Sequence, residues 1–132
     1  MDKKLKHLEF IQGVINRLST NSFLLKGWSV VLVSALFALA ANGSKVAFVY
    51  LAYIPSVVFW GLDGYFLTLE RAYRKHYDRV RAMKEEEIDF SMDIGDEYGG
   101  FSGWAEATSS KTLIPFHGAL VGAVLLVMLI QR

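Results

Sequence analysis

The chain has 132 residues, of which 53% are hydrophobic and 14% aromatic, and it contains no cysteine. The lack of cysteine excludes disulfides, thiolate nucleophiles and cysteine-based zinc sites. A net charge of +1 argues against general nucleic-acid binding, so no direct nucleic-acid partner is expected. The length predicts one domain, residues 1–132, and a sizeable core is expected to come from packing helices together between subunits.

Residues 1–22 predict an amphipathic helix. Its apolar positions recur every three or four residues: Leu5, Leu8, Ile11, Ile15 and Leu18. The helix could lie on the inner leaflet, with its lysines near anionic headgroups. The wide apolar face favours the alternative, in which it packs on the cytoplasmic extension of another helix. Residues 19–28 are then expected to bend the chain toward the bilayer.

Three apolar blocks follow, at residues 23–41, 46–69 and 113–130. About 20 helical residues cross the ~30 Å hydrocarbon core, and each block is close to that length. The fold class is therefore expected to be all-α, a polytopic membrane protein with three transmembrane helices. Pro55 lacks a backbone N–H and is expected to bend the second of them.

The lysines and arginines predict the orientation. Twelve of the 14 lie before or at the start of the first block, or between the second and third; the exceptions are Lys45 and Arg132. Positive charge collects on the cytoplasmic side of inner-membrane proteins. The N-terminus and the segment 70–112 should be cytoplasmic, and the C-terminus should face out.

Asp63 is the only charged residue of the second block, about 25 Å from Val46 along a helix of ~1.5 Å rise. Lys26 and His117 lie at a similar inner depth in the other two blocks. An ionisable group inside a membrane suggests function, with a partner of opposite charge. The three residues form a candidate intramembrane polar cluster. A structural latch is favoured over an ion pathway, and a purely interfacial Asp63 remains a third interpretation.

Small residues predict close helix packing at two places. Gly118 and Gly122 form a GxxxG pair in the third block, and Ser34 and Ala38 have the same spacing in the first. Small residues allow helix backbones to approach one another in lipid. The pattern does not distinguish packing within one chain from packing between chains.

The second apolar block should continue as a cytoplasmic helix, because no glycine or proline interrupts residues 70–87. Its basic residues follow at once: Arg71, Arg74, Lys75, Arg79 and Arg81. Arg71 and His76 have a spacing that resembles the RxxxxH motif of HEPN ribonucleases, but Ala72 stands where those enzymes usually carry a polar residue. A juxtamembrane helix in contact with solvent or lipid is the favoured interpretation.

Residues 85–106 are acidic and rich in glycine, which predicts irregular backbone folded against the basic helix of its own or a neighbouring subunit. Four aromatic residues are expected to anchor it in a groove: Phe90, Tyr98, Phe101 and Trp104. The acids depart from the EF-hand pattern, and the sequence offers no phosphate loop, nucleophile triad or metal-ligand cluster. We therefore expect no catalytic residue, no metal and no cofactor.

The order of the segments "HLEFIQGVINRLSTNSFLLKGW", "FWGLDGYFLTLERAYRKHYDRVR" and "SSKTLIPFHG" resembles RipA-family octameric small bacterial membrane proteins, which include the pore-like accessory of type VI CRISPR immunity. The resemblance implies a homo-oligomer, an octamer, in the bacterial inner membrane that perturbs the membrane in anti-phage defence. It carries over no catalytic residue.

Two functions then compete. The first is an oligomeric pore or channel, in contact with membrane lipids and assembled through its cytoplasmic segments. The second is a non-conducting scaffold that recruits a soluble cytoplasmic defence protein. A polar stripe along a span would favour the pore, but an apolar pore can also gate by dewetting.

Overall fold

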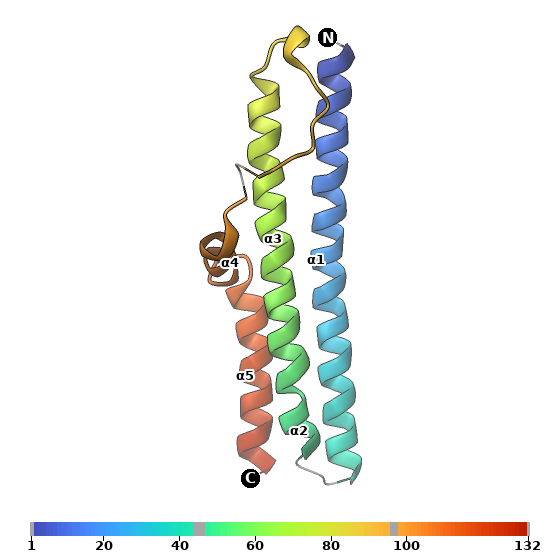
Figure 1. Cartoon of the computed structure of the whole chain (residues 1–132). Coiled ribbons are helices and arrows are strands. Elements are labelled where there is room, and N and C mark those ends of the chain that lie inside the picture. Colours follow the sequence, from blue (N-terminus) through green and yellow to red (C-terminus); the bar gives the residue numbers. More distant parts are fainter. Residues whose placement is uncertain (1, 44–46, 96–97, 132) are drawn as a thin grey trace.

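The computed structural model describes residues 2–43, 47–95 and 98–131, and within them the chain is all-helical. Figure 1 shows two long antiparallel helices, α1 (Asp2–Gly43) and α3 (Tyr53–Arg81), joined through the short α2 (Ala47–Leu51). The helix α5 (Ile114–Gln131) runs beside one half of α3, and α4 (Gly100–Thr108) lies beside its middle. Five residues used in the sequence analysis lie outside these ranges, so the structure does not test the expectations that rest on them: Lys45, Val46, Asp96, Glu97 and Arg132.

The amphipathic segment and the first apolar block form one continuous helix, so the expected bend at residues 19–28 is wrong. No proline occurs between residues 2 and 43, and Gly27 is tolerated inside the helix. The polar side chains around the expected bend bond to α3 or to the helix itself rather than redirecting the chain. At ~1.5 Å per residue, the 42 residues of α1 extend for about 63 Å, roughly twice the hydrocarbon thickness.

The first half of α1 packs on the last part of α3. Ile11, Ile15 and Val80 form a buried cluster, with Tyr73 and Tyr77 against it. This contact confirms the packing alternative for the N-terminal segment and the continuation of the second apolar block into a long helix. The N-terminus of α1 is capped by a residue that is distant in sequence. The Glu85 carboxylate accepts hydrogen bonds from the backbone N–H groups of Lys3 (2.9 Å) and Lys4 (3.2 Å).

The helix assignment is interrupted between α2 and α3, three residues before Pro55, while Ala52 keeps helical backbone angles, and the bend expected at Pro55 stays a prediction. The helix is interrupted at Ala52, whose N–H donates to the carbonyls of Phe48 and Val49. Proline cannot donate to the carbonyl four residues earlier, and its ring crowds that carbonyl. The interruption therefore falls one turn before Pro55.

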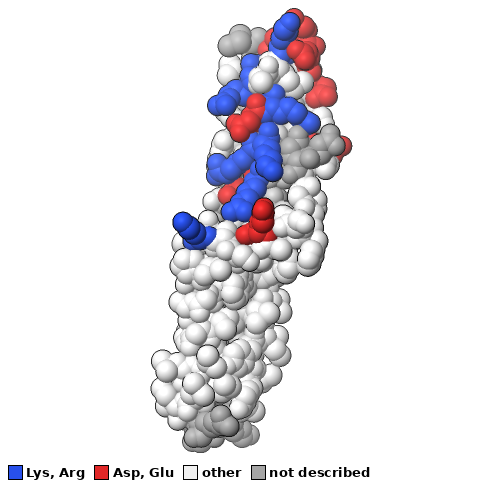
Figure 2. All heavy atoms as spheres, turned by 90° about the vertical axis from the view of Figure 1, so that its left-hand side faces the viewer, with Lys and Arg blue, Asp and Glu red and all other residues white. Residues whose placement is uncertain are grey.

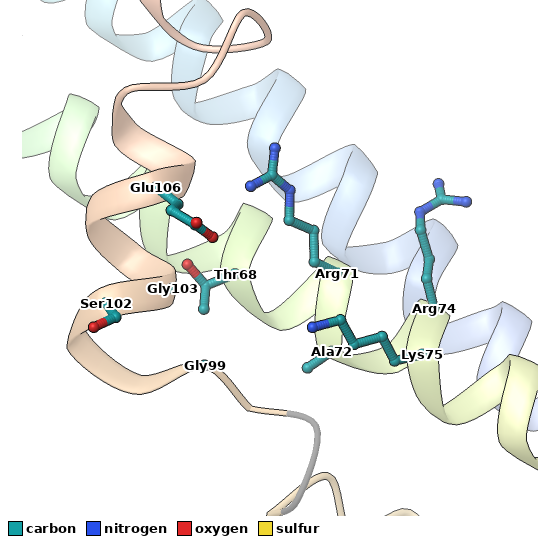
Figure 3. Close-up of a pocket in the computed structure, with 9 residues that line it drawn as sticks. All are labelled: Thr68, Arg71, Ala72, Arg74, Lys75, Gly99, Ser102, Gly103 and Glu106. Carbon is teal, nitrogen blue, oxygen red and sulfur yellow. The ribbon is translucent and has the colours of Figure 1, made fainter.

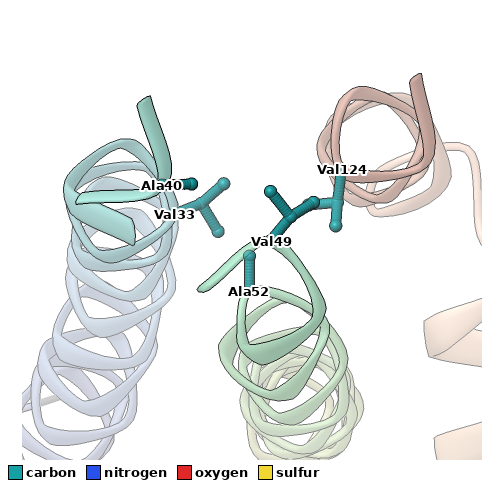
Figure 4. Packing of buried hydrophobic residues seen from close by; sticks show 5 residues of the cluster. All are labelled: Val33, Ala40, Val49, Ala52 and Val124. Carbon is teal, nitrogen blue, oxygen red and sulfur yellow. The ribbon is translucent and has the colours of Figure 1, made fainter. Parts of the chain in front are cut away.

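In the apolar half, a small core joins α1, α2 and α5 with the start of α3 (Figure 4). It consists of Val33, Ala40, Val49, Ala52 and Val124. The small residues predicted to pack helices lie elsewhere: Ser34, Ala38 and Gly122 are exposed, and a Cβ added at Gly122 would meet nothing within 4 Å. Gly118 is half-buried, and its nearest neighbour is Ile114 of its own helix. Val33, not Ser34, occupies the inward face of α1, because successive helical residues are about 100° apart. Close helix packing through these four residues stays a prediction.

Two helices are long and apolar enough to cross a membrane, the segments Asp2–Ala41 and Ala47–Arg81. Only 17% and 28% of their most apolar windows are buried. The core helix of a soluble protein would be mostly buried, whereas here large side chains such as Trp28 (60% exposed) point outward. The third apolar helix is shorter, Ile114–Ile130. On the face shown in Figure 2, charged residues gather over one half of the molecule and uncharged ones form the other.

Residues 100–108 form the helix α4, so the irregular backbone expected there is wrong. Gly100 has φ +61, a conformation that suits glycine, and the helix starts from it. Trp104 is an anchor as expected, since its indole Nε1–H donates to the Gly61 carbonyl at 2.9 Å. Phe101 is 80% exposed and is not an anchor.

The segment 88–95 crosses over α1 and α3 of its own chain (Figure 1). Both His7 and His76, almost fully buried, donate from Nε2 to the Ser91 carbonyl at 2.8 and 2.7 Å. Tyr73 donates to the Met92 carbonyl at 3.4 Å, and Phe90 lies against His7. Histidines and backbone carbonyls thus attach this segment, which belongs to the same subunit as the basic helix.

Candidate functional site

A buried polar cluster forms where α1, α3 and α5 meet. Asp63 of α3 is fully buried. Its Oδ2 accepts from Lys26 Nζ of α1 at 2.5 Å and from His117 Nε2 of α5 at 2.7 Å. Its Oδ1 accepts from the hydroxyl of Ser22, which in turn accepts from Lys26 Nζ at 2.9 Å. The structure brings together the three residues singled out in the sequence and adds Ser22, so Asp63 does not face headgroup water.

Local sequence explains why these side chains converge. Ser22 and Lys26 are four residues apart on an unbroken helix, so they share one face. Asp63 lies beside Gly64, and this glycine lets α4 approach α3 closely. His117 occupies the first turn of α5, where its N–H donates to the Leu113 carbonyl. The cluster ties the starting turn of α5 to the middle of the α1–α3 pair.

The hydrogen bonds define the protonation pattern of the cluster. Asp63 accepts from three donors, which fits a carboxylate, and the Lys26 ammonium balances its charge. His117 donates from Nε2 while its buried Nδ1 has no partner among the described residues. The neutral Nε2–H tautomer leaves only an acceptor unpaired, so the network assigns it. The imidazole also stacks on Trp60, with centroids 5.8 Å apart and planes 7° apart.

Access to the cluster comes from the α1 side. The Lys26 side chain keeps 22% of its exposure, while those of Asp63 and His117 keep none. A cavity of about 270 Å³ is lined by Ser22 and Lys26 together with Glu70 of α3. The carboxylate is therefore enclosed within the chain, and the ammonium is the part of the cluster that a cavity reaches. This arrangement can hold three helices together and can respond to groups that enter beside Lys26.

The juxtamembrane basic residues separate into two groups along α3. Arg71, Arg74 and Lys75 line a cavity between α3 and α4 (Figure 3). Arg79 donates from Nη2 to His76 Nδ1 at 2.9 Å, and Arg81 lies 3.6 Å from Asp78 with both side chains exposed.

The spacing of Arg71 and His76 does not bring them together. His76 is 1% exposed and bonded to the Ser91 carbonyl, whereas Arg71 lines the cavity on the other side of α3. Five helical residues correspond to a turn of about 140° between the two side chains. A pair that acts jointly on RNA needs both groups open to one substrate, and this geometry gives them different surroundings.

Three residues that form these contacts were not predicted from the sequence. Ser22 could have been identified, because it lies one helical turn before Lys26. Trp60 and Ser91 could not, since a stacking partner and a backbone acceptor have no sequence motif. Among residues 2–43, 47–95 and 98–131, no group of three His, Cys, Asp or Glu residues is placed to hold a metal ion.

Comparisons add no relative, because no family model, curated protein or solved structure matches this chain.

Proposed function

We propose that this chain is an integral membrane protein of the bacterial inner membrane that assembles with copies of itself into a pore and acts in anti-phage defence. The observation that supports membrane assembly is the outward apolar surface of α1 and α3, whose apolar windows are only 17% and 28% buried. In water such a surface would be covered by a partner or lipid. The resemblance to RipA-family proteins favours the octamer, conduction and defence.

In this proposal α5 is the third span, and the boundary with the cytoplasm runs near Asp63. The described residues 27–43, 47–62 and 112–131 contain no Asp, Glu, Lys or Arg. The charged half of the α1–α3 pair then projects into the cytoplasm together with the segment 88–95 and α4. A buried ion pair at the boundary costs less than one at the bilayer centre.

Topology gives the first test. A periplasm-dependent reporter fused after the last residue, Arg132, should be active, and the same reporter fused before Met1 should be inactive, because positive residues are retained in the cytoplasm. Activity of the N-terminal fusion, or silence of the C-terminal one, would contradict the three-span orientation.

Assembly should depend on the small residues that the protomer leaves uncovered. Nothing lies within 4 Å of a Cβ at Gly122, so Gly122→Leu should leave the protomer folded. If this face meets a second copy, the larger side chain separates the helices and lowers the oligomer mass in detergent. The control is Ile130→Val, on the same helix, 72% exposed and about 80° around the helix from Gly122, which should leave the mass unchanged. A Gly122→Leu protein with wild-type oligomer mass would remove this face from the interface.

A scaffold without conduction is the second candidate. One observation favours it: Lys26, Asp63 and His117 point into the protomer, so these ionisable groups of the apolar half do not form a stripe on its outer face. Dye release from vesicles containing the oligomer separates the two functions. Release that follows protein concentration and disappears with Gly122→Leu supports the pore, while assembled protein that releases nothing supports the scaffold.

A further inference from the structure

The cavity between α3 and α4 has a volume of about 380 Å³ and an unusual concentration of charge. Arg71, Arg74 and Lys75 reach it from α3, and Ser102 and Glu106 from α4. In Figure 3 the Lys75 ammonium is directed toward the space between the two helices, and the Glu106 carboxylate is directed into it from the opposite side. The cavity is thus built from two elements far apart in sequence.

Two of its cations are outside the ion pairs formed by the described residues. Arg74 Nε lies 3.7 Å from the Glu70 carboxylate. Arg71 and Lys75 form no ion pair within residues 2–43, 47–95 and 98–131. They are four residues apart on α3, so their like charges repel each other across one helical turn. An anion placed between them would offset this repulsion and accept hydrogen bonds from both.

The charge of the cavity indicates the charge of its ligand. Among the described residues that line the cavity, Arg71 and Lys75 supply two positive charges and Glu106 one negative charge, while Arg74 is paired with Glu70. The net single positive charge of these described residues matches a monoanion such as a phosphodiester. A phosphomonoester with two negative charges would leave an excess beside the Glu106 carboxylate.

The position of the cavity indicates where such a phosphodiester comes from. The Arg71 backbone lies eight residues beyond Asp63, about 12 Å along α3 from the end of the uncharged half. Helical side chains tilt toward the N-terminus of their helix, which in α3 is the uncharged end, so the long Arg71 side chain extends back toward the headgroup layer. Next to Ser102, Phe101 is 80% exposed and its ring lies 5.6 Å from that of Trp104. Exposed aromatic rings at the end of an apolar surface are typical of the headgroup layer of a membrane.

We propose that this cavity binds the phosphodiester headgroup of an anionic membrane phospholipid, with the phosphate between Arg71 and Lys75. The proposal rests on the membrane insertion put forward above, since only insertion places the cavity at headgroup height. The lipid would join α3 to α4 from outside and stabilise the position of α4.

The test is native mass spectrometry of the full chain, released from detergent micelles that contain equal amounts of phosphatidylglycerol and phosphatidylcholine. We expect bound phosphatidylglycerol to exceed phosphatidylcholine by about 25-fold, or about fivefold for each of the two cations. Arg71→Gln with Lys75→Gln should bring this ratio close to one. Arg81→Gln is the matched control for Arg71→Gln alone, since each removes one positive charge from α3. Arg81→Gln lies outside the cavity and should keep the wild-type ratio, whereas Arg71→Gln should lower it about fivefold. Glu106→Gln should raise the ratio.

An unchanged ratio in the Arg71→Gln, Lys75→Gln protein would overturn the lipid site. Displacement of phosphatidylglycerol by inorganic phosphate at millimolar concentration would also overturn it, because it would identify a soluble phosphate as the ligand. Flotation with vesicles of each lipid separates the two proposals. A protein that floats with neither contradicts membrane insertion, whereas one that floats with both and shows a ratio near one contradicts only the lipid site.

Discussion

Asp63→Asn is expected to lower the free energy of unfolding in detergent by about 3 kcal/mol, the scale for breaking a buried ion pair. Asparagine cannot balance the Lys26 ammonium, which then remains 78% enclosed without a counter-charge. It also offers a single acceptor to the three donors that now converge on Asp63: Ser22, Lys26 and His117. The measurement is thermal unfolding of the purified protein, with oligomer mass recorded in parallel.

The control for this change is a double-mutant cycle. Lys26→Met removes the ammonium and fills its volume, so Lys26→Met with Asp63→Asn should recover part of the loss. A coupling energy of about 2 kcal/mol would identify the pair as a latch between α1 and α3. Zero coupling between Asp63 and Lys26, and again between Asp63 and His117→Gln, would contradict a joint role for the cluster.

The convergence of Lys26, Asp63 and His117 could be anticipated, because depth along a helix follows from residue count. Three apolar blocks of similar length place groups near their inner ends at one height, and a buried charge needs a partner. The helical content could also be predicted, and so could the contact between residues 1–22 and the end of α3. The apolar residues of 1–22 recur with the helical period of 3.6 residues, which identifies an apolar face that has to be covered.

Other features of the fold depend on tertiary contacts that no local sequence pattern predicts. The sequence "STNSFLLKGW" has polar and small residues typical of a bend, but the bonds of Ser22 and Lys26 to Asp63 belong to a straight α1. The glycines before Trp104 predict irregular backbone, whereas Gly100 starts α4 at positive φ and Gly103 lies inside α4, facing Thr68 of α3. The two histidines that hold Ser91 are separated by 69 positions, so their meeting follows from the tertiary fold alone.

Gly64→Ala should destabilise the protein by about 2 kcal/mol, because α3 and α4 are in contact at this glycine. A Cβ at this position would overlap the Thr108 methyl group and lie 3.3 Å from Trp104 Nε1. To make room, α4 has to move away from α3, which strains the bond from Trp104 Nε1 to the Gly61 carbonyl. The free energy of unfolding and the emission maximum of tryptophan fluorescence should both change.

Two further variants test whether this overlap causes the loss of stability in Gly64→Ala. Gly13→Ala adds the same methyl group to α1 where nothing lies within 4 Å, so it should stabilise the helix by up to about 1 kcal/mol. Thr108→Ser removes the overlapping methyl and keeps the hydroxyl that donates to the Ala105 carbonyl. In the Gly64→Ala background it should restore most of the lost stability. A Gly64→Ala protein as stable as Gly13→Ala would show that α4 does not pack on α3 at this point, and the cavity that depends on this contact would lose its second wall.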